Sequence, residues 1–231
     1  ACATLQLGGT AANGSNTAGT LTFSGSSTLT VSGSVLIGGD GHSSRDGTIT
    51  FTGGSTLNAG SVTLGGSGGN PGQGTITMTA GGTLKPGSLA VGTGAGTWTP
   101  GTGTVELDET NTLPATLITS FRNLVINGGT TTISTATSIT NGGSLTLTSG
   151  TLAAGTNLTM ASTSNNTRSG GSLTGTLQGA GVYDVTFTGN SKTTGPELDG
   201  SGLRNVTVNL ISGQTLTLGA NAAPDGNLTI S

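Results

Sequence analysis

A pattern of apolar and hydroxyl side chains repeats at a nearly constant spacing through the first hundred residues. Ile49 follows Leu21 by 28 residues (49 − 21) and precedes Ile76 by 27 residues (76 − 49). A fixed period of this length is typical of solenoid proteins, in which each repeat stacks on the next. Glycines separate three short runs of alternating polar and apolar residues within the period 47–74, and these runs are 48–51, 55–59 and 61–64.

The alternation within each run predicts β-strands with one buried face. Ile49 and Phe51 would point inward, whereas Thr48 and Thr50 would point outward. Glycine at the corners allows the chain to turn at positive φ without a Cβ clash. The sequence therefore predicts an all-β fold, a parallel β-helix (β-solenoid) with about three strands and 27 residues per coil. The apolar columns of its core would be Leu21/Ile49/Ile76, Phe23/Phe51/Met78, Leu29/Leu57/Leu84, Val35/Val62/Leu89 and Ile37/Leu64/Val91.

The regular spacing ends near Pro100, a residue that cannot donate a hydrogen bond to a β-ladder. A looser repeat follows, because residues 121–126 (FRNLVI) are echoed by residues 203–208 (LRNVTV), 82 positions later (203 − 121). Since 82 is close to three periods of 27, we expect the solenoid to continue through the second half. The prediction is one elongated domain, residues 1–231, with a change of repeat pattern near residue 100.

The composition argues against several classes of protein. Disorder usually accompanies low hydrophobicity and high net charge, whereas this chain is 31% apolar with a net charge of −3. Its six Lys and Arg residues, scattered over 231 positions, cannot form the basic stripe that binds nucleic acid. No apolar run approaches the ~18 residues of a membrane span. We therefore expect neither a nucleic-acid partner nor a membrane span.

Few side chains are available for catalysis or metal binding. The single histidine, His42, lies in a glycine-rich loop with Asp40, Arg45 and Asp46, and we interpret this cluster as a solvated connection rather than a binding site. A metal site built on His42 would need further ligands. The calcium-binding repeat G-G-x-G-x-D has Ser43 where its aspartate should be.

Paired carboxylates are the machinery of carbohydrate-cleaving β-helices. The candidates here are Glu106 and Asp108, with Glu197 or Asp199 further along the chain. Acids on the rim of a strand more often face solvent, and we interpret these four in that way. The sequence thus predicts a protein that is not an enzyme and that has no cofactor and no metal.

The single cysteine, Cys2, cannot form a disulfide within the chain. A lone thiol near a terminus is usually incidental. The alternative is an intermolecular link or an attachment point.

Threonine occupies the outward positions of the first run in successive repeats. A regular array of hydroxyl and methyl groups on a β-solenoid would suit binding to ice or to a polysaccharide. The simpler interpretation is that threonine favours strands and that stacked threonine pairs stabilise them. The ladder consists of Thr20, Thr22, Thr48, Thr50, Thr75, Thr77, Thr97 and Thr99. Asn-x-Ser/Thr triplets, which arise readily by chance in such a sequence, begin at Asn13, Asn157, Asn165, Asn205 and Asn227.

Several stretches resemble repeat-rich bacterial surface proteins, namely β-helical autotransporter passengers and filamentous-haemagglutinin-like adhesins. These stretches are the GT[IL]T[FM] run at 47–51 and 74–78, the GSVxLGG run at 60–66, and SFRNLVINGG followed by SLTLTSGTLAAGTNLTM between 120 and 160. The resemblance implies a right-handed parallel β-helix, secretion, and a structural or adhesive role. It carries no catalytic residues onto this chain.

The sequence as a whole favours a non-enzymatic extracellular structural protein, a β-solenoid segment of a cell-surface adhesin or of a self-assembling fibre. Neither end of the sequence shows a capping helix or a charged, proline-bearing strand that would blunt an open sheet edge. We therefore expect the partner to be the protein itself, either by end-to-end stacking or by continuation in a longer chain. A glycan or a host surface is the further candidate partner. The alternative function is an ice- or polysaccharide-binding solenoid that uses the threonine ladder.

Overall fold

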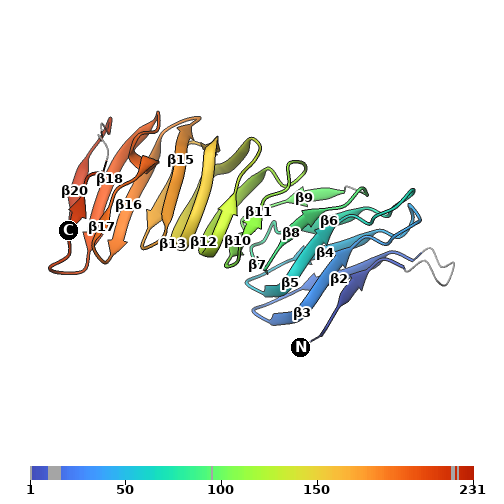
Figure 1. The fold of residues 1–231 in the computed structure, drawn as a ribbon. Helices are drawn as coiled ribbons and strands as arrows, with labels where there is room; N and C mark the ends of the chain where they lie inside the picture. The colour runs from blue at the N-terminus through green and yellow to red at the C-terminus, as the bar shows by residue number, and fades with distance from the viewer. Residues whose placement is uncertain (1, 10–16, 95, 220–221, 223) are drawn as a thin grey trace. The chain divides into compact units, whose positions relative to one another are not determined.

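The computed structural model describes residues 2–9, 17–94, 96–219, 222 and 224–231 (Figure 1). Within these residues the chain is all-β, and the paired strands of its long sheets run parallel. The one helical segment among them is the short 3₁₀-helix η2 (Pro196–Leu198). The predicted all-β parallel solenoid is confirmed. Contacts divide the chain into two compact units, residues 1–106 with 113–118 and residues 107–112 with 119–231.

The first unit contains two parallel sheets. Its strands are β1 (Leu5–Leu7), β2 (Gly19–Phe23), β3 (Thr28–Ile37), β4 (Gly47–Phe51), β5 (Thr56–Leu64), β6 (Gly74–Thr77), β7 (Thr83–Pro86), β8 (Leu89–Val91), β9 (Thr97–Thr99) and β10 (Thr104–Leu107), whose last residue belongs to the second unit. One sheet has the order β2-β4-β6-β9. In the other, β1, β3, β5, β7 and β10 lie side by side, and β8 pairs with the second part of β5.

The register of these sheets confirms the predicted columns. Leu21 pairs with Ile49, and Ile49 with Ile76, at the expected spacings of 28 and 27 residues. The columns that begin at Leu29, Val35 and Ile37 are likewise in register through three strands. Their central members are fully buried, and a buried Leu, Ile, Val or Phe contributes on the order of 1.5–3 kcal/mol.

One detail of the prediction is corrected by the structure. Residues 55–59 and 61–64 were expected to form two separate strands, but they lie in the single strand β5. The preceding repeat does the same in β3, where a register shift falls between Val31 and Ser34. The corner between the two runs is therefore a bend within a strand rather than a break, because Gly60 permits close approach to Ser32 and Gly33 without ending the ladder.

Glycine is required where the loops of successive repeats stack. A Cβ built on Gly74, the first residue of β6, would lie 2.3 Å from the backbone nitrogen of Gly65 and 2.3 Å from the carbonyl oxygen of Ile37. Only hydrogen fits at that distance. Gly65 itself has a φ of 86°, a left-handed conformation that residues with a Cβ rarely adopt. The glycine-rich loops thus pack backbone against backbone.

The second unit is also built from parallel strands. These are β11 (Asn111–Thr112), β12 (Ser120–Thr132), β13 (Thr137–Met160), β14 (Ser164–Arg168), β15 (Ser172–Gly179), β16 (Tyr183–Gly189), β17 (Lys192–Thr193), β18 (Leu203–Leu210), β19 (Leu216–Thr217) and β20 (Leu228–Ile230). Its main sheet has the order β12-β13-β14-β16-β18-β20. β11 pairs with β12, β15 pairs with β13, and β17 and β19 form a separate pair.

Paired residues are closer in sequence in the second unit than the sequence analysis predicted. Asn123 pairs with Ser144, and Ser144 with Asn165, each 21 residues further on. The echoed segments at 121–126 and 203–208 are therefore separated by four strand pairings, not by three periods of 27. The expectation failed because an offset of 82 divides almost equally well by either spacing.

The stacked glycine loops make a testable prediction. Gly74→Ala should lower the free energy of unfolding of the first unit by about 1–3 kcal/mol, because the added methyl group collides with fixed backbone. Gly54→Ala is the matched control, since a Cβ at Gly54 meets no atom within 4 Å and its φ is not left-handed. We expect the control to stay within about 1 kcal/mol of the parent in urea unfolding. Equal effects of the two substitutions would contradict the stacked arrangement.

Candidate functional site

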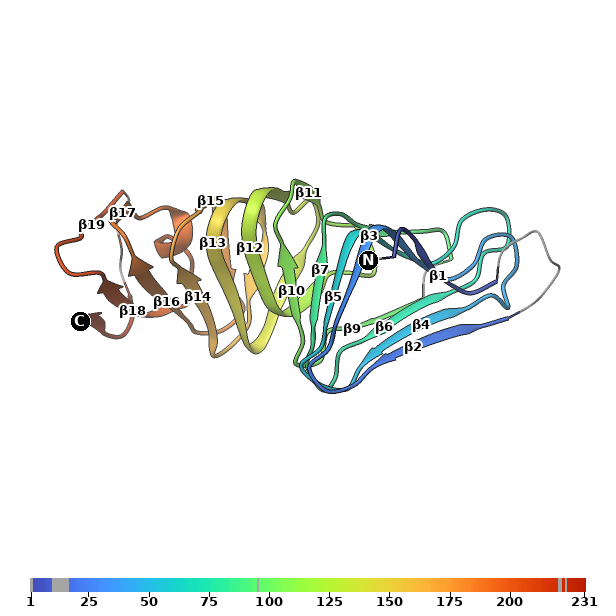
Figure 2. The same ribbon diagram turned by 90° about the horizontal axis from the view of Figure 1, so that it is seen from below.

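The structure brings the predicted threonine ladder together on one face of the first unit. The sheet β2-β4-β6-β9 holds all eight residues in two rows, and Figure 2 shows these strands side by side. The rows are Thr20, Thr48, Thr75 and Thr97, and Thr22, Thr50, Thr77 and Thr99. Between them the inward residues Ile49 and Ile76 are fully buried, so the threonines point to the opposite, outer face.

Regular spacing is what this face offers chemically. Successive threonines in a row repeat at the strand separation of ~4.8 Å. Thr20, Thr22 and Thr97, on the outer strands, are exposed, and the threonines of β4 and β6 are half-buried between their neighbours. Such an array can present hydroxyl groups to a periodic ligand, and its use as a binding face stays a prediction.

The polar loop of the first unit links one repeat to the next. The Asp40 carboxylate accepts hydrogen bonds from the backbone nitrogen and the hydroxyl of Ser67, at 2.6 Å and 2.9 Å. The Asp46 carboxylate accepts one from the backbone nitrogen of Gln73 at 2.7 Å. The Arg45 side chain is buried and donates to the carbonyl oxygen of Asp40 at 2.6 Å. These charges tie stacked loops together, which is more than the solvated connection that the sequence predicted.

Cys2 lies at the edge of the first unit with an exposed thiol. Its backbone nitrogen donates to the carbonyl oxygen of Thr30, and its own carbonyl accepts from the backbone nitrogen of Ser32. The thiol donates to the carbonyl oxygen of Thr4 at 2.9 Å. The thiol is therefore held in place and accessible, and an intermolecular link through it stays a prediction.

A second polar array, which the sequence analysis did not identify, covers the main sheet of the second unit. Two outward rows run across its strands, and between β14 and β20 they line a shallow depression of about 460 Å³. The residues that line it are Asn165, Asp184, Thr186, Asn205, Thr207, Asn227 and Thr229. Three of the Asn-x-Thr triplets that we attributed to chance therefore lie on one face. The available signal was the recurrence of Asn/Asp/Ser-x-Thr at about 21-residue spacing.

Hydrogen bonds within this array connect each strand to the next. The Asn205 side-chain nitrogen donates to the Asp184 carboxylate at 2.9 Å, and the Asn227 backbone nitrogen donates to the Asn205 side-chain oxygen at 3.0 Å. Arg204 binds Asp184 through two hydrogen bonds, at 3.0 Å and 2.6 Å. These bonds from Arg204 lower the pKa of Asp184. The row behaves as an asparagine ladder that stabilises the stacked strands.

A buried polar cluster occupies the interior of the second unit. Arg168 takes an inward position on β14, in register with Leu147 and Phe187 of the neighbouring strands. Its guanidinium donates to the Glu197 carboxylate at 2.5 Å and to the carbonyl oxygen of Thr193 at 3.0 Å. Glu197 lies in η2, is fully buried, and also accepts a hydrogen bond from the backbone nitrogen of Gly195 at 2.9 Å.

The candidate carboxylates thus have different environments. The expectation that all four face solvent is wrong for Glu197, because η2 directs its side chain inward to Arg168. Glu106 in the first unit forms an ion pair with Lys85 at 3.0 Å and is partly exposed. A buried charge that loses its partner is strongly destabilising, so the Arg168–Glu197 pair is accounted for by the stability of the fold.

Within the described residues, no three side chains of His, Cys, Asp or Glu lie close enough to hold a metal ion. The described part of the chain also contains no helix of the length and apolar character needed to cross a bilayer. No protein-family model matches the chain, and searches of curated proteins and of solved structures give no match.

Tyr183, which donates a hydrogen bond to the carbonyl oxygen of Glu197, tests the buried cluster. Burial, followed by the negative charges of Asp199 and Glu197, raises the pKa of Tyr183 from 10.0 to about 12. Since the folded pKa lies above the unfolded one, this contribution to stability is complete below pH 10 and is lost as the pH rises towards 12.

Because the chain has one tyrosine, its ultraviolet absorbance titration reports this pKa directly. We expect the folded chain to titrate about two pH units above the urea-unfolded chain. Asp199→Asn should move the folded value downward, whereas Asp40→Asn, a change in the other unit, should leave it unchanged. Titration at the ordinary tyrosine value in the folded chain would contradict the buried position.

Proposed function

We propose that this protein is a non-enzymatic extracellular structural protein, a β-solenoid segment of a cell-surface adhesin or fibre. The observation that carries the proposal is the in-register stacking of both faces of the sheets. Apolar columns such as Leu21–Ile49–Ile76 run inside, while rows of threonine and asparagine run outside. Because strands, columns, rows and loop carboxylates all join one repeat to the next, load along a unit is shared by many parallel hydrogen bonds.

The character of the surface supports a role outside the cell. Charged residues make up only 6% of the chain, and much of this charge is used inside the fold, as in Asp40–Ser67 and Arg168–Glu197. The outer rows hold neutral hydroxyl and amide groups, which can contact glycans or a host surface by hydrogen bonding. The resemblance of the repeats to bacterial surface adhesins agrees with secretion.

A second candidate function is binding to ice or to a polysaccharide through the threonine ladder. The observation in its favour is that all eight threonines lie in two straight rows on one four-stranded sheet. The same array has a purely structural explanation, because threonine pairs across strands each contribute roughly 0.2–1 kcal/mol. Binding measurements separate the two interpretations.

Surface labelling tests the main proposal. Antibodies raised against the purified 231-residue chain should label intact cells of the source organism, and protease added to intact cells should remove the signal. An intracellular protein of the same cells serves as the control and should be labelled only after permeabilisation. Labelling of this protein that also requires permeabilisation would rule out the extracellular role.

The threonine ladder can be tested by substitution at its centre. If the ladder binds a solid or polymeric ligand, Thr50→Lys should abolish thermal hysteresis or polysaccharide retention, because a long charged side chain interrupts the array. Thr56→Lys on β5, in the other sheet, is the matched control and should retain binding. Absence of both activities in the parent chain at high concentration would remove this second function.

A further inference from the structure

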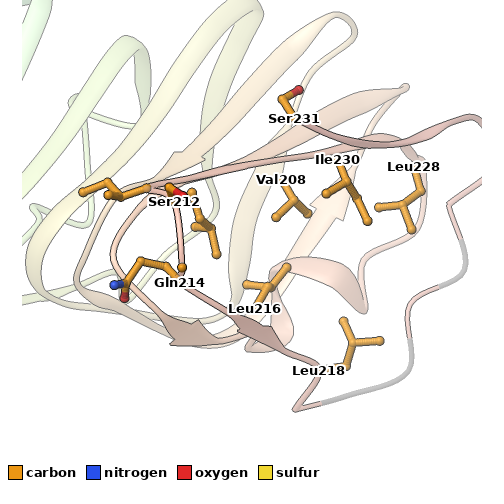
Figure 3. Close-up of a pocket in the computed structure, with 11 residues that line it drawn as sticks. Val208, Ser212, Gln214, Leu216, Leu218, Leu228, Ile230 and Ser231 are labelled. Atoms are coloured by element: carbon orange, nitrogen blue, oxygen red, sulfur yellow. The ribbon is translucent and has the colours of Figure 1, made fainter.

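Large apolar side chains are exposed mainly at one end of the second unit. Of the five that are exposed among the described residues, four lie here, at exposed fractions of 59% to 75%. These four are Ile211, Leu218, Leu228 and Ile230. They line a cavity of about 420 Å³ together with Val208 and Leu216. Figure 3 shows these apolar side chains around one hollow.

The exposed side chains continue the inner columns of the solenoid. Leu228 pairs with Val206, and Ile230 pairs with Val208, on the neighbouring strand β18. Val206 and Val208 are buried because β20 covers them, whereas no described strand covers β20 in turn. The end of the unit is therefore a section through the core, of a kind that is rarely left open to water.

The backbone of β20 requires the same kind of partner. One edge of this strand pairs with β18, and no described strand pairs with its other edge. An edge of this kind offers backbone N–H and C=O groups to another strand. The partner must therefore provide a β-strand whose apolar residues alternate in the manner of Leu228 and Ile230.

Charge and the opposite edge of the chain narrow the choice of partner. None of the residues that line the cavity is Asp, Glu, Lys or Arg, so two copies of this surface would not repel each other. At the first strands of the other unit, by contrast, the described large apolar side chains are buried or half-buried and none is exposed. They are Leu5, Leu7, Leu21, Phe23, Leu29 and Val31.

We propose that this end of the second unit binds the same end of a second copy of the chain. A two-fold axis would place β20 antiparallel to β20 of the partner, so that both open cores are covered by one contact. A head-to-tail contact would instead set the apolar end against the edge without exposed apolar side chains and leave the match incomplete. The two-fold contact is self-complementary and closed, so assembly stops at a dimer instead of growing into a fibre.

Sedimentation velocity and light scattering across micromolar to millimolar concentrations test the contact. The Cys2→Ser chain is used, so that no disulfide contributes to association. We expect a monomer–dimer equilibrium with no larger species. Ile230→Lys and Leu228→Lys should each weaken dimerisation by more than roughly tenfold, because each places a charge in the centre of an apolar contact. Both side chains are largely exposed in the single chain, so neither substitution removes core packing.

Thr207→Lys is the matched control, since it adds the same charge to the outer face of β18, one strand away from the edge. It should leave the dimerisation constant within about threefold of the parent. Thermal unfolding of each variant at low concentration verifies that its fold is intact.

Three results would overturn the proposal. They are a parent that stays monomeric over the whole range, growth of oligomers beyond two copies, and a dimer that is unaffected by Ile230→Lys. The contact concerns only the end of the second unit and is independent of the extracellular role proposed above.

Discussion

Register between parallel strands is the constraint on which this structure depends. Each strand takes its backbone hydrogen bonds from a strand one repeat away, so every inward side chain must stack on an inward side chain of the next repeat. A slip by one residue would turn a whole column outward. Leu21, Ile49 and Ile76 satisfy this requirement through side-chain alternation. Gly74 and Gly65 satisfy it by leaving room for stacked backbones.

The same constraint makes polar residues repeat, with consequences that differ between inside and outside. Outside, Asn205 and Asn227 bond to the strand before them and become a ladder. Inside, a polar residue interrupts a column and needs a partner from elsewhere. Arg168 stands between Leu147 and Phe187, and η2 supplies Glu197 to neutralise it. The irregular segment around η2 is thus explained by one inward arginine.

A stacked fold also leaves its ends with surfaces that the repeats themselves cannot cover. In the second unit this surface is apolar and uncharged around Leu228 and Ile230, which favours a partner with the same properties. The outer faces are neutral and regular, which suits repeated weak hydrogen bonds to extended ligands. A structural role and a self-complementary end are therefore compatible uses of a single architecture.

The sequence by itself determined the fold class and the core of the first unit. Alternation together with a constant period leaves only one register for Leu29, Leu57 and Leu84, and the eight threonines then follow onto one outer face. The spacing in the second unit was not predictable, because inward Asn166 and Arg168 break the apolar signal that marks each repeat.

The tertiary structure alone decided the burial of Glu197 and the openness of the end at β20. Burial depends on which segments lie against a side chain, and local alternation does not encode it. Glu197 resembles a surface acid in the sequence and becomes a core residue because η2 turns it towards Arg168. Leu228 and Ile230 resemble core residues and are exposed because no described strand follows them in the stack.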